Sequence, residues 1–412
     1  MAARSRGPIS IDKIVAVRSA VLPFYLILRP DGRVTAADEV SEDGWDFLTT
    51  KMHGEKISFQ SIYGDYLSAE GGSICLRRYC SDNEKFTVER KDTQYAFRAM
   101  SGQYLSMNER EPFVGLSPAC GETEVFQLFS LMMYGCNVGK QLETLETKGS
   151  VMIDGLCEIE QLTALRQDLP DGAADGHEVR IPSLATRSSA FADLASHPMV
   201  MQLALRMVSS RIKLSSMESC RTDADHVRKE LEATTWHVVH PYSDVEHPGI
   251  VDAKVSLSAV WFLDELNSTN STWAWVNPPL SEGSHLPKLP QLSSPDEVTA
   301  IVKDAKPLRA KQGSLWLYLG PIWMSNNMGA ASFWKDYDAQ TRYKHLSGQK
   351  EQTFRALTDA QRAMQPRDEL CPTILQATYV REFVVARDPP VAQEIVAGFQ
   401  KPMLERLLTS QR

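Results

Sequence analysis

The two residues best suited to chemistry are His237 and Arg342, which stand at the borders of a tract rich in aromatic side chains. An imidazole can act as a general acid or a general base near neutral pH. Apolar walls that carry a few polar groups are typical of small-molecule sites. We therefore expect His237 and Arg342 to be the catalytic residues of such a site, with proton transfer as its chemistry.

The aromatic tract supplies the expected walls of this site. Six of the eight tryptophans of the chain fall within it, and strand alternation will turn some of them inward and others into the core. We expect the substrate pocket to be lined by Trp236, Val239, Trp261, Trp275, Asn277, Tyr318, Trp323 and Met324. Such a lining favours an apolar small molecule, for example a terpenoid or a polyketide.

The elements that position these residues are short strands preceded by amphipathic helices. Residues 148–156 form a strand and a turn in this interpretation, and the apolar spacing of residues 158–166 predicts a helix. Residues 255–265 and 313–324 are apolar runs of strand length. Acidic residues follow the first of these runs, so Asp264 and Glu265 are further candidate partners for His237.

The order of short motifs in this half of the chain resembles the phytanoyl-CoA dioxygenase family. The matching motifs, in chain order, are Asp154-Gly155, Trp236-His237, Leu263-Asp264-Glu265, Gly283-Ser284-His285, Trp323-Met324 and Arg342. The resemblance implies a double-stranded β-helix, a cupin-like jelly roll with helices packed on one sheet. It also implies an ancestry among oxygenases that use Fe(II) and 2-oxoglutarate.

The iron site that the resemblance implies is incomplete. The family binds Fe(II) through two histidines and one carboxylate on one face of the metal. His237 matches the first histidine, but Val239 stands at the carboxylate position and Met324 at the second histidine. A valine cannot bind a metal, and a thioether is a poor ligand for Fe(II). We therefore expect no metal ligands and no cofactor, although Arg342 matches the residue that holds the far carboxylate of 2-oxoglutarate.

Three functions fit this pattern. The first is an enzyme of the isomerase, lyase or cyclase type that needs neither metal nor 2-oxoglutarate and uses the former oxygenase cavity. The second is a pseudoenzyme that binds a ligand or an active paralogue. The third is an oxygenase dependent on Fe(II) and 2-oxoglutarate with unorthodox ligands, which donors in the segment 240–247 could supply.

A different, repeated pattern occupies the first third of the chain, with a period of about 40 residues. The second and third copies contain Tyr-Leu-Ser runs at Tyr66 and Tyr104, each followed by an acidic turn that leads into an aromatic strand, at Glu84 and Glu122. The first copy, from Phe24, is looser. Three such copies predict a β-trefoil, and the pattern resembles the trefoils of the fascin-like family. One interpretation is that the module binds actin, a sugar or a partner, or joins chains into a homo- or hetero-oligomer. The other, which we favour, is that it packs on the second domain.

These expectations define a mainly β chain with helices and with four segments. They are an N-terminal extension over 1–19, the trefoil over 20–135, a linker over 136–147 and the jelly-roll domain over 148–412. The net charge of −8 and the absence of a block of basic residues argue against nucleic acid as a partner. The apolar run at 21–28 is too short to cross a membrane, so we expect no membrane partner and a cytoplasmic location.

Overall fold

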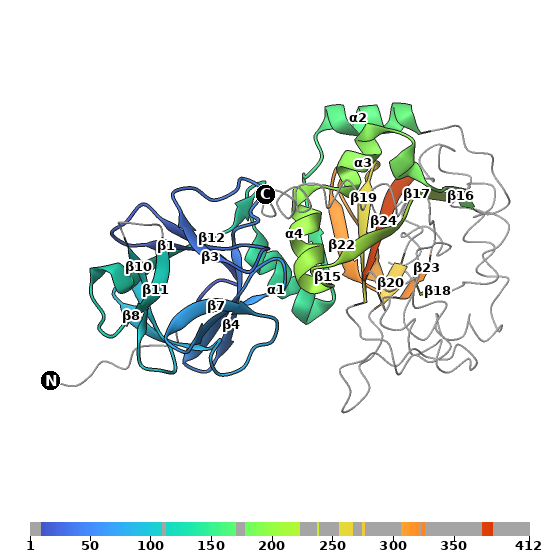
Figure 1. Cartoon of the computed structure of the whole chain (residues 1–412). Helices are drawn as coiled ribbons and strands as arrows, with labels where there is room; N and C mark the ends of the chain where they lie inside the picture. Colours follow the sequence, from blue (N-terminus) through green and yellow to red (C-terminus); the bar gives the residue numbers. More distant parts are fainter. Residues whose placement is uncertain are drawn as a thin grey trace, which may run out of the picture. The chain divides into compact units, whose positions relative to one another are not determined.

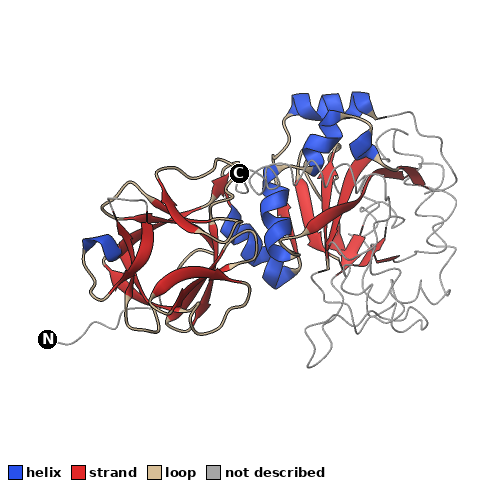
Figure 2. Cartoon of the chain, viewed as in Figure 1, coloured by secondary structure: helices blue, strands red, loops and turns tan. Residues whose placement is uncertain are grey.

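The protein is mainly β and forms two compact units (Figures 1 and 2). The first unit comprises the described residues up to Glu146 together with His197–Arg211, and the second comprises Thr147–Ser196 and the described residues from Ile212 onward. The computed structural model describes residues 10–108, 113–169, 178–222, 237–238, 255–266, 274–276, 306–320, 323–325 and 373–381. Within these residues, no helix is long and apolar enough to cross a membrane.

The first unit contains a β-trefoil of twelve strands. Its strands are β1 (Ile14–Ser19), β2 (Tyr25–Leu28), β3 (Val34–Ala37), β4 (Leu48–His53), β5 (Lys56–Gln60), β6 (Tyr66–Glu70), β7 (Ser73–Arg77), β8 (Phe86–Lys91), β9 (Gln94–Arg98), β10 (Tyr104–Asn108), β11 (Phe113–Ser117) and β12 (Val125–Ser130). Six of them, β1, β4, β5, β8, β9 and β12, pair antiparallel in a closed ring. The hairpins β2–β3, β6–β7 and β10–β11 complete the three repeats. Because β1 belongs to the ring, the trefoil begins inside the segment expected to be an N-terminal extension.

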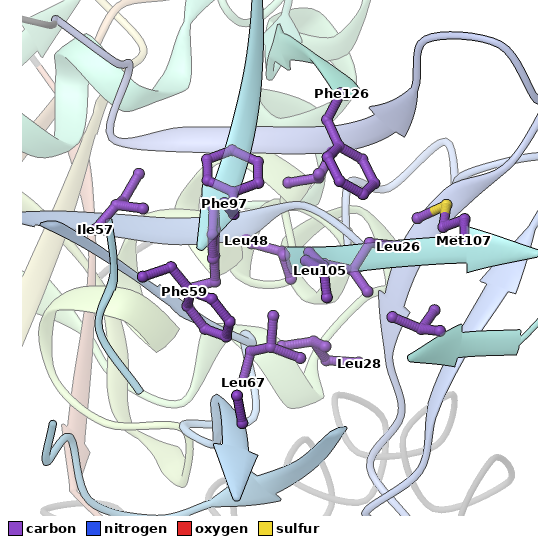
Figure 3. Packing of buried hydrophobic residues seen from close by; sticks show 14 of the residues in the cluster. Leu26, Leu28, Leu48, Ile57, Phe59, Leu67, Phe97, Leu105, Met107 and Phe126 are labelled. Atoms are coloured by element: carbon purple, nitrogen blue, oxygen red, sulfur yellow. The ribbon is translucent and has the colours of Figure 1, made fainter. Parts of the chain in front are cut away.

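Buried aromatic rings fill the centre of this barrel (Figure 3). Phe59 and Phe97 meet edge to face with their ring centroids 4.9 Å apart, and Phe97 lies 5.7 Å from Phe126. These three rings are inaccessible to solvent and come from β5, β9 and β12. The strands that follow the acidic turns supply Phe86 and Phe126, and both are core residues, as expected of these repeats.

The repeated sequence signature is a hydrogen-bonded unit. In the second repeat, Ser68 of the Tyr-Leu-Ser strand donates to the Glu84 carboxylate at 2.5 Å, and Ser81 donates its backbone N–H to the same carboxylate. In the third repeat, Ser106 donates to Glu124 at 2.6 Å. Burial raises the pKa of Glu84, but the hydrogen bonds from Ser68 and Ser81 outweigh it and hold that pKa below its usual value. The strand and the acidic turn thus depend on one another.

The segment expected to be a linker is folded. A short hairpin of β13 (Met132–Met133) and β14 (Cys136–Asn137) leads into the helix α1 (Val138–Lys148). Lys13 forms an ion pair with Glu146 of this helix at 2.9 Å. A Cβ at Gly139 would lie only 3.1 Å from the backbone nitrogen of Ile14, so the absence of a side chain allows the helix to approach β1.

A helix from the middle of the sequence also belongs to the trefoil unit. Helix α4 (Pro198–Met207) lies inside the segment expected to be jelly roll, yet Gln202 donates to the carbonyl of Asp43 at 2.6 Å. Arg206 donates to the carbonyl of Phe47 at 2.8 Å and to the hydroxyl of Thr49 at 3.0 Å. Burial of this guanidinium lowers its pKa to about 9, so its hydrogen bonds to neutral acceptors must offset a desolvation cost.

The residue before α4 makes the stability of this unit dependent on pH. His197 is buried and its ring lies 4.8 Å from that of Tyr134, and burial lowers its pKa from 6.5 to about 4. Between these values the unfolded chain binds a proton that the folded chain does not, so stability falls as the pH falls. The full loss in the free energy of unfolding, reached below the folded pKa, is about 3 kcal/mol.

Urea unfolding of the wild type and of His197→Asn from pH 7.5 to about 4 will test this pH dependence. The wild type should lose more stability than the variant, and equal slopes would refute the assignment.

The second unit is a double-stranded β-helix. Its larger sheet has the order β15-β22-β19-β24-β17-β16 and its smaller sheet the order β18-β23-β20-β21. The strands are β15 (Ser150–Ile153), β16 (Glu178–Ile181), β17 (Ile212–Thr222), β18 (His237–Val238), β19 (Ser256–Phe262), β20 (Ala274–Val276), β21 (Lys306–Pro307), β22 (Leu315–Leu319), β23 (Trp323–Ser325) and β24 (Thr373–Arg381). From β17 to β24 the chain passes back and forth between the two sheets, which defines the architecture.

Helices cover one face of the larger sheet. They are α2 (Ile159–Asp168) and α3 (Ser189–Ala195), and Tyr379 on β24 donates its hydroxyl hydrogen to the carbonyl of Ala195 at 2.6 Å. Successive strand residues alternate between the two faces of a sheet. Tyr379 therefore lies on the helix-covered face, and its neighbour Thr378 lies on the opposite face. The opposite face is called the interior face below.

Candidate functional site

The smaller sheet aligns three of the expected site residues in one cross-strand row. His237 on β18 stands directly opposite Met324 on β23, and Met324 stands directly opposite Trp275 on β20. Residues directly opposite one another in antiparallel strands have neighbouring backbone positions. The sequence order of motifs therefore becomes a spatial neighbourhood of His237, Met324 and Trp275.

A tryptophan pair links this row to the interior face of the larger sheet. Trp275 packs on Trp316 of β22 with the ring centroids 5.5 Å apart, and Trp316 packs on Tyr318 at 4.5 Å. All three rings belong to one apolar cluster with Val260 and Phe262 of β19. Trp275 therefore points from the smaller sheet toward the interior face of the larger sheet.

Hydroxyl residues form a continuous row across five strands of the interior face. Every neighbouring pair in it is in direct register, and all five residues are buried. The row consists of Ser150, Tyr318, Ser258, Thr378 and Ser216. The hydroxyls of Ser258 and Thr378 lie 3.2 Å apart. A polar row inside a jelly roll is unusual, because buried polar groups need partners there.

The adjacent row on the interior face ends in a carboxylate. Trp316 stands opposite Val260, Val260 opposite Gln376, and Gln376 opposite Glu218. Glu218 and Gln376 are 5% and 7% exposed, so both are held inside the protein. Neither residue belongs to a motif that the sequence singles out. The sequence does contain one indication of them: polar residues alternate along segment 216–220, whereas an apolar core strand would contain none.

One of the expected pocket residues, Trp261, points elsewhere in the fold. Trp261 is 1% exposed but stands opposite Leu315 and Leu375, in the alternate register to Val260, so it lies on the helix-covered face. Trp323 stands in register with Val238. The expectations for Arg342, Trp236, Val239 and Asn277 fall outside the described residues.

Asp264, one of the two acidic residues suggested as partners of His237, has structural contacts. Asp264 accepts a hydrogen bond from Arg166 of α2 at 2.6 Å and one from the backbone N–H of Thr373 at 2.8 Å, so it joins a helix to the start of β24. In the same way, Asp154 binds Lys311 at 2.8 Å and accepts from Ser314. The bond to Lys311 holds the pKa of Asp154 below its usual value.

Within the part of the chain that the structure describes, no three His, Cys, Asp or Glu side chains are grouped to hold a metal ion. The residue in register with His237 is Met324, and a soft thioether is a poor ligand for Fe(II).

The solved structures to which this chain is distantly similar include the following two. One is SeviL bound to asialo-GM1 saccharide, with 10% identity, 29% of this chain and 98% of that chain covered, and a TM-score of 0.27. The other is the non-heme alpha ketoglutarate dependent epimerase SnoN from nogalamycin biosynthesis, with 13% identity, coverage of 59% and 83%, and a TM-score of 0.36. No family model and no curated protein matches the chain. The fold assignment therefore rests on the strand pairing described above.

Proposed function

We propose that the second unit is an enzyme of phytanoyl-CoA dioxygenase ancestry that works without iron and without 2-oxoglutarate. Its reaction is a proton transfer of the isomerase, lyase or cyclase type, and its substrate is an apolar small molecule held between the two sheets. The observation that carries this proposal is the pairing of His237 with Met324. It leaves an imidazole, suited to acid–base work, without the second imidazole that an iron site needs.

The surroundings of this row support a small-molecule site. Trp275, Trp316 and Tyr318 supply aromatic surface, and the buried hydroxyls and Glu218 supply polar groups on the same interior face. Small-molecule sites typically combine apolar walls with a few polar groups that fix orientation. A purely structural core would have no use for so many polar residues, because each must find a partner or costs free energy.

The test is metal analysis of the purified full-length protein, followed by calorimetric titration with Fe(II) and with 2-oxoglutarate under anaerobic conditions. The wild type is expected to contain no stoichiometric iron and to bind neither ligand. Stoichiometric iron together with 2-oxoglutarate binding would overturn the proposal in favour of an oxygenase with unorthodox ligands. Co-purification with an active paralogue, without turnover by the isolated chain, would favour a pseudoenzyme instead.

A further inference from the structure

The repeats of the trefoil place a matching pair of side chains where two strands of a repeat meet. In the first repeat, Arg18 of β1 stands in register with Tyr25 of β2. In the third repeat, Arg98 of β9 stands in register with Tyr104 of β10. The two pairs occupy equivalent positions of an internal repeat, so their surroundings can be compared directly.

The pair in the third repeat holds a carboxylate from the chain itself. Glu89, on the neighbouring ring strand β8, forms an ion pair with Arg98 at 3.0 Å. Its carboxylate also accepts a hydrogen bond from the hydroxyl of Tyr104 at 3.1 Å. Contacts of a carboxylate with a guanidinium are stronger than those between neutral groups. Arg98, Tyr104 and Glu89 are called the third-repeat cluster below.

The first repeat has an aromatic ring in the place of this carboxylate. Glu89 stands in register with the residue two positions before Arg98. Phe129 of β12 stands in register with the residue two positions before Arg18. Phe129 is therefore the equivalent of Glu89, and Arg18, Tyr25 and Phe129 are called the first-repeat cluster below.

The guanidinium of the first-repeat cluster has no acidic partner. Its Cζ lies 5.6 Å from the centroid of the Tyr25 ring, and that ring packs on Phe129 at 6.4 Å. Among the described residues, Arg18 has no ion pair, and its buried Nε–H has no hydrogen-bond partner. A buried donor without a partner costs free energy. Phe129 is 41% exposed, so this donor lies beside an aromatic ring that a second molecule can reach.

The second repeat shows that the fold does not require a cation at this position. There Gln60 is the equivalent of Arg18, and its amide donates to the carbonyl of Gly64 at 2.9 Å. Lys51 is the equivalent of Phe129 on the neighbouring strand. The combination of an unpaired guanidinium and an exposed ring is therefore specific to the first repeat and needs an explanation other than folding.

We propose that the first-repeat cluster binds a carboxylate from another molecule, and that this molecule is a peptide segment in which apolar residues flank a glutamate. The glutamate takes the place that Glu89 has in the third-repeat cluster, with Arg18 and Tyr25 as donors. An apolar neighbour of the glutamate packs on Phe129. Arginine and aromatic side chains are enriched at protein interfaces, which favours a peptide over a free anion. This role of the trefoil does not depend on the reaction of the second unit.

The probe is the peptide acetyl-Gly-Leu-Glu-Leu-Gly-amide, whose blocked ends leave the glutamate as its only charge, titrated into the full-length protein by calorimetry. A second peptide has glutamine in place of the glutamate. The wild type should bind the glutamate peptide at a single site, and the glutamine peptide about tenfold more weakly or worse, because a charge-assisted contact is lost. Arg18→Gln should remove this preference. Arg78→Gln, the same change at an exposed residue of the trefoil, is the matched control and should keep it.

Exchanging residues between the two clusters gives an independent measurement. Phe129→Glu supplies the carboxylate from within the chain, as in the third-repeat cluster, so binding of the glutamate peptide should be lost. Glu89→Phe leaves Arg98 and Tyr104 without their carboxylate and should create a second site, seen as a rise in stoichiometry from one peptide to two.

Equal affinities of the wild type for the two peptides, or unchanged binding by Arg18→Gln, would overturn the proposal. Binding of sialyllactose that depends on Arg18, without binding of the peptide, would also overturn it, because the occupant is then an acidic sugar. Circular dichroism melts show whether each variant is folded. If Arg18→Gln does not fold, Phe129→Glu decides the matter, since retained peptide binding by that variant contradicts the assigned site.

Discussion

The double variant Val239→Asp/Met324→His is expected to bind Fe(II) in stoichiometric amount, whereas the wild type is expected to bind none. The two substitutions return a carboxylate and a second imidazole to the positions implied by the family resemblance. Because Met324 stands directly opposite His237, a histidine there can share a metal with it. Two histidines and a carboxylate on one face form the ligand set of non-heme Fe(II) oxygenases. Loss of a supporting partner alone costs about 10–100-fold in metal affinity, so restoring two direct ligands should gain more than that.

Anaerobic calorimetry and metal analysis measure this gain. Met324→His alone supplies two imidazoles without the carboxylate and should bind more weakly than the double variant. Met132→His is the control, because it introduces a histidine at an exposed position of the trefoil unit, away from His237. If the double variant binds no more iron than the Met132→His control, the assignment of Val239 and Met324 to the former ligand positions fails, and with it the argument that iron was lost there.

The trefoil could be predicted from the sequence because its signature is local. The Tyr-Leu-Ser strand and the acidic turn lie within one repeat, and the structure shows that Ser68 and Glu84 bond to each other. Such a motif recurs in the sequence of each repeat, because it does not depend on contacts between residues far apart in the chain. Helix α4 could not be assigned in this way, because the bonds of Gln202 and Arg206 to the trefoil join residues about 160 positions apart, and no local pattern encodes them.

The interior face was harder to predict because a β-bulge changes the alternation of β17. Leu214 pairs with Tyr379 on the helix-covered face, but Ser216 pairs with Thr378 on the interior face, and Ser215 is the extra residue between them. Strict alternation from Leu214 would have placed Glu218 under the helices. The same limit applies to Trp261, since the identity of a tryptophan does not reveal which face of a fully buried strand it occupies.

Replacing Trp316 with alanine is expected to destabilise the second unit by about 3–5 kcal/mol, the range found when a large buried aromatic side chain is removed. Trp316 is 2% exposed and contacts both Tyr318 on its own strand and Trp275 on the smaller sheet. Its loss therefore leaves a cavity and also removes an aromatic contact between the two sheets. The row of Met324 and His237 is hydrogen-bonded to the strand of Trp275, so it should loosen as well.

Hydrogen–deuterium exchange followed by mass spectrometry can locate this effect, and urea unfolding gives its size. Peptides from β20 and β23 should lose protection in Trp316→Ala, while peptides from β5 and β9 of the trefoil keep theirs. Trp316→Phe preserves an aromatic ring between the sheets and should lose less than half as much stability. Trp45→Ala, at a half-buried position of the first unit, is the control for removing a tryptophan elsewhere. Equal losses in Trp316→Ala and Trp45→Ala would show that the tryptophan pair does not hold the two sheets together.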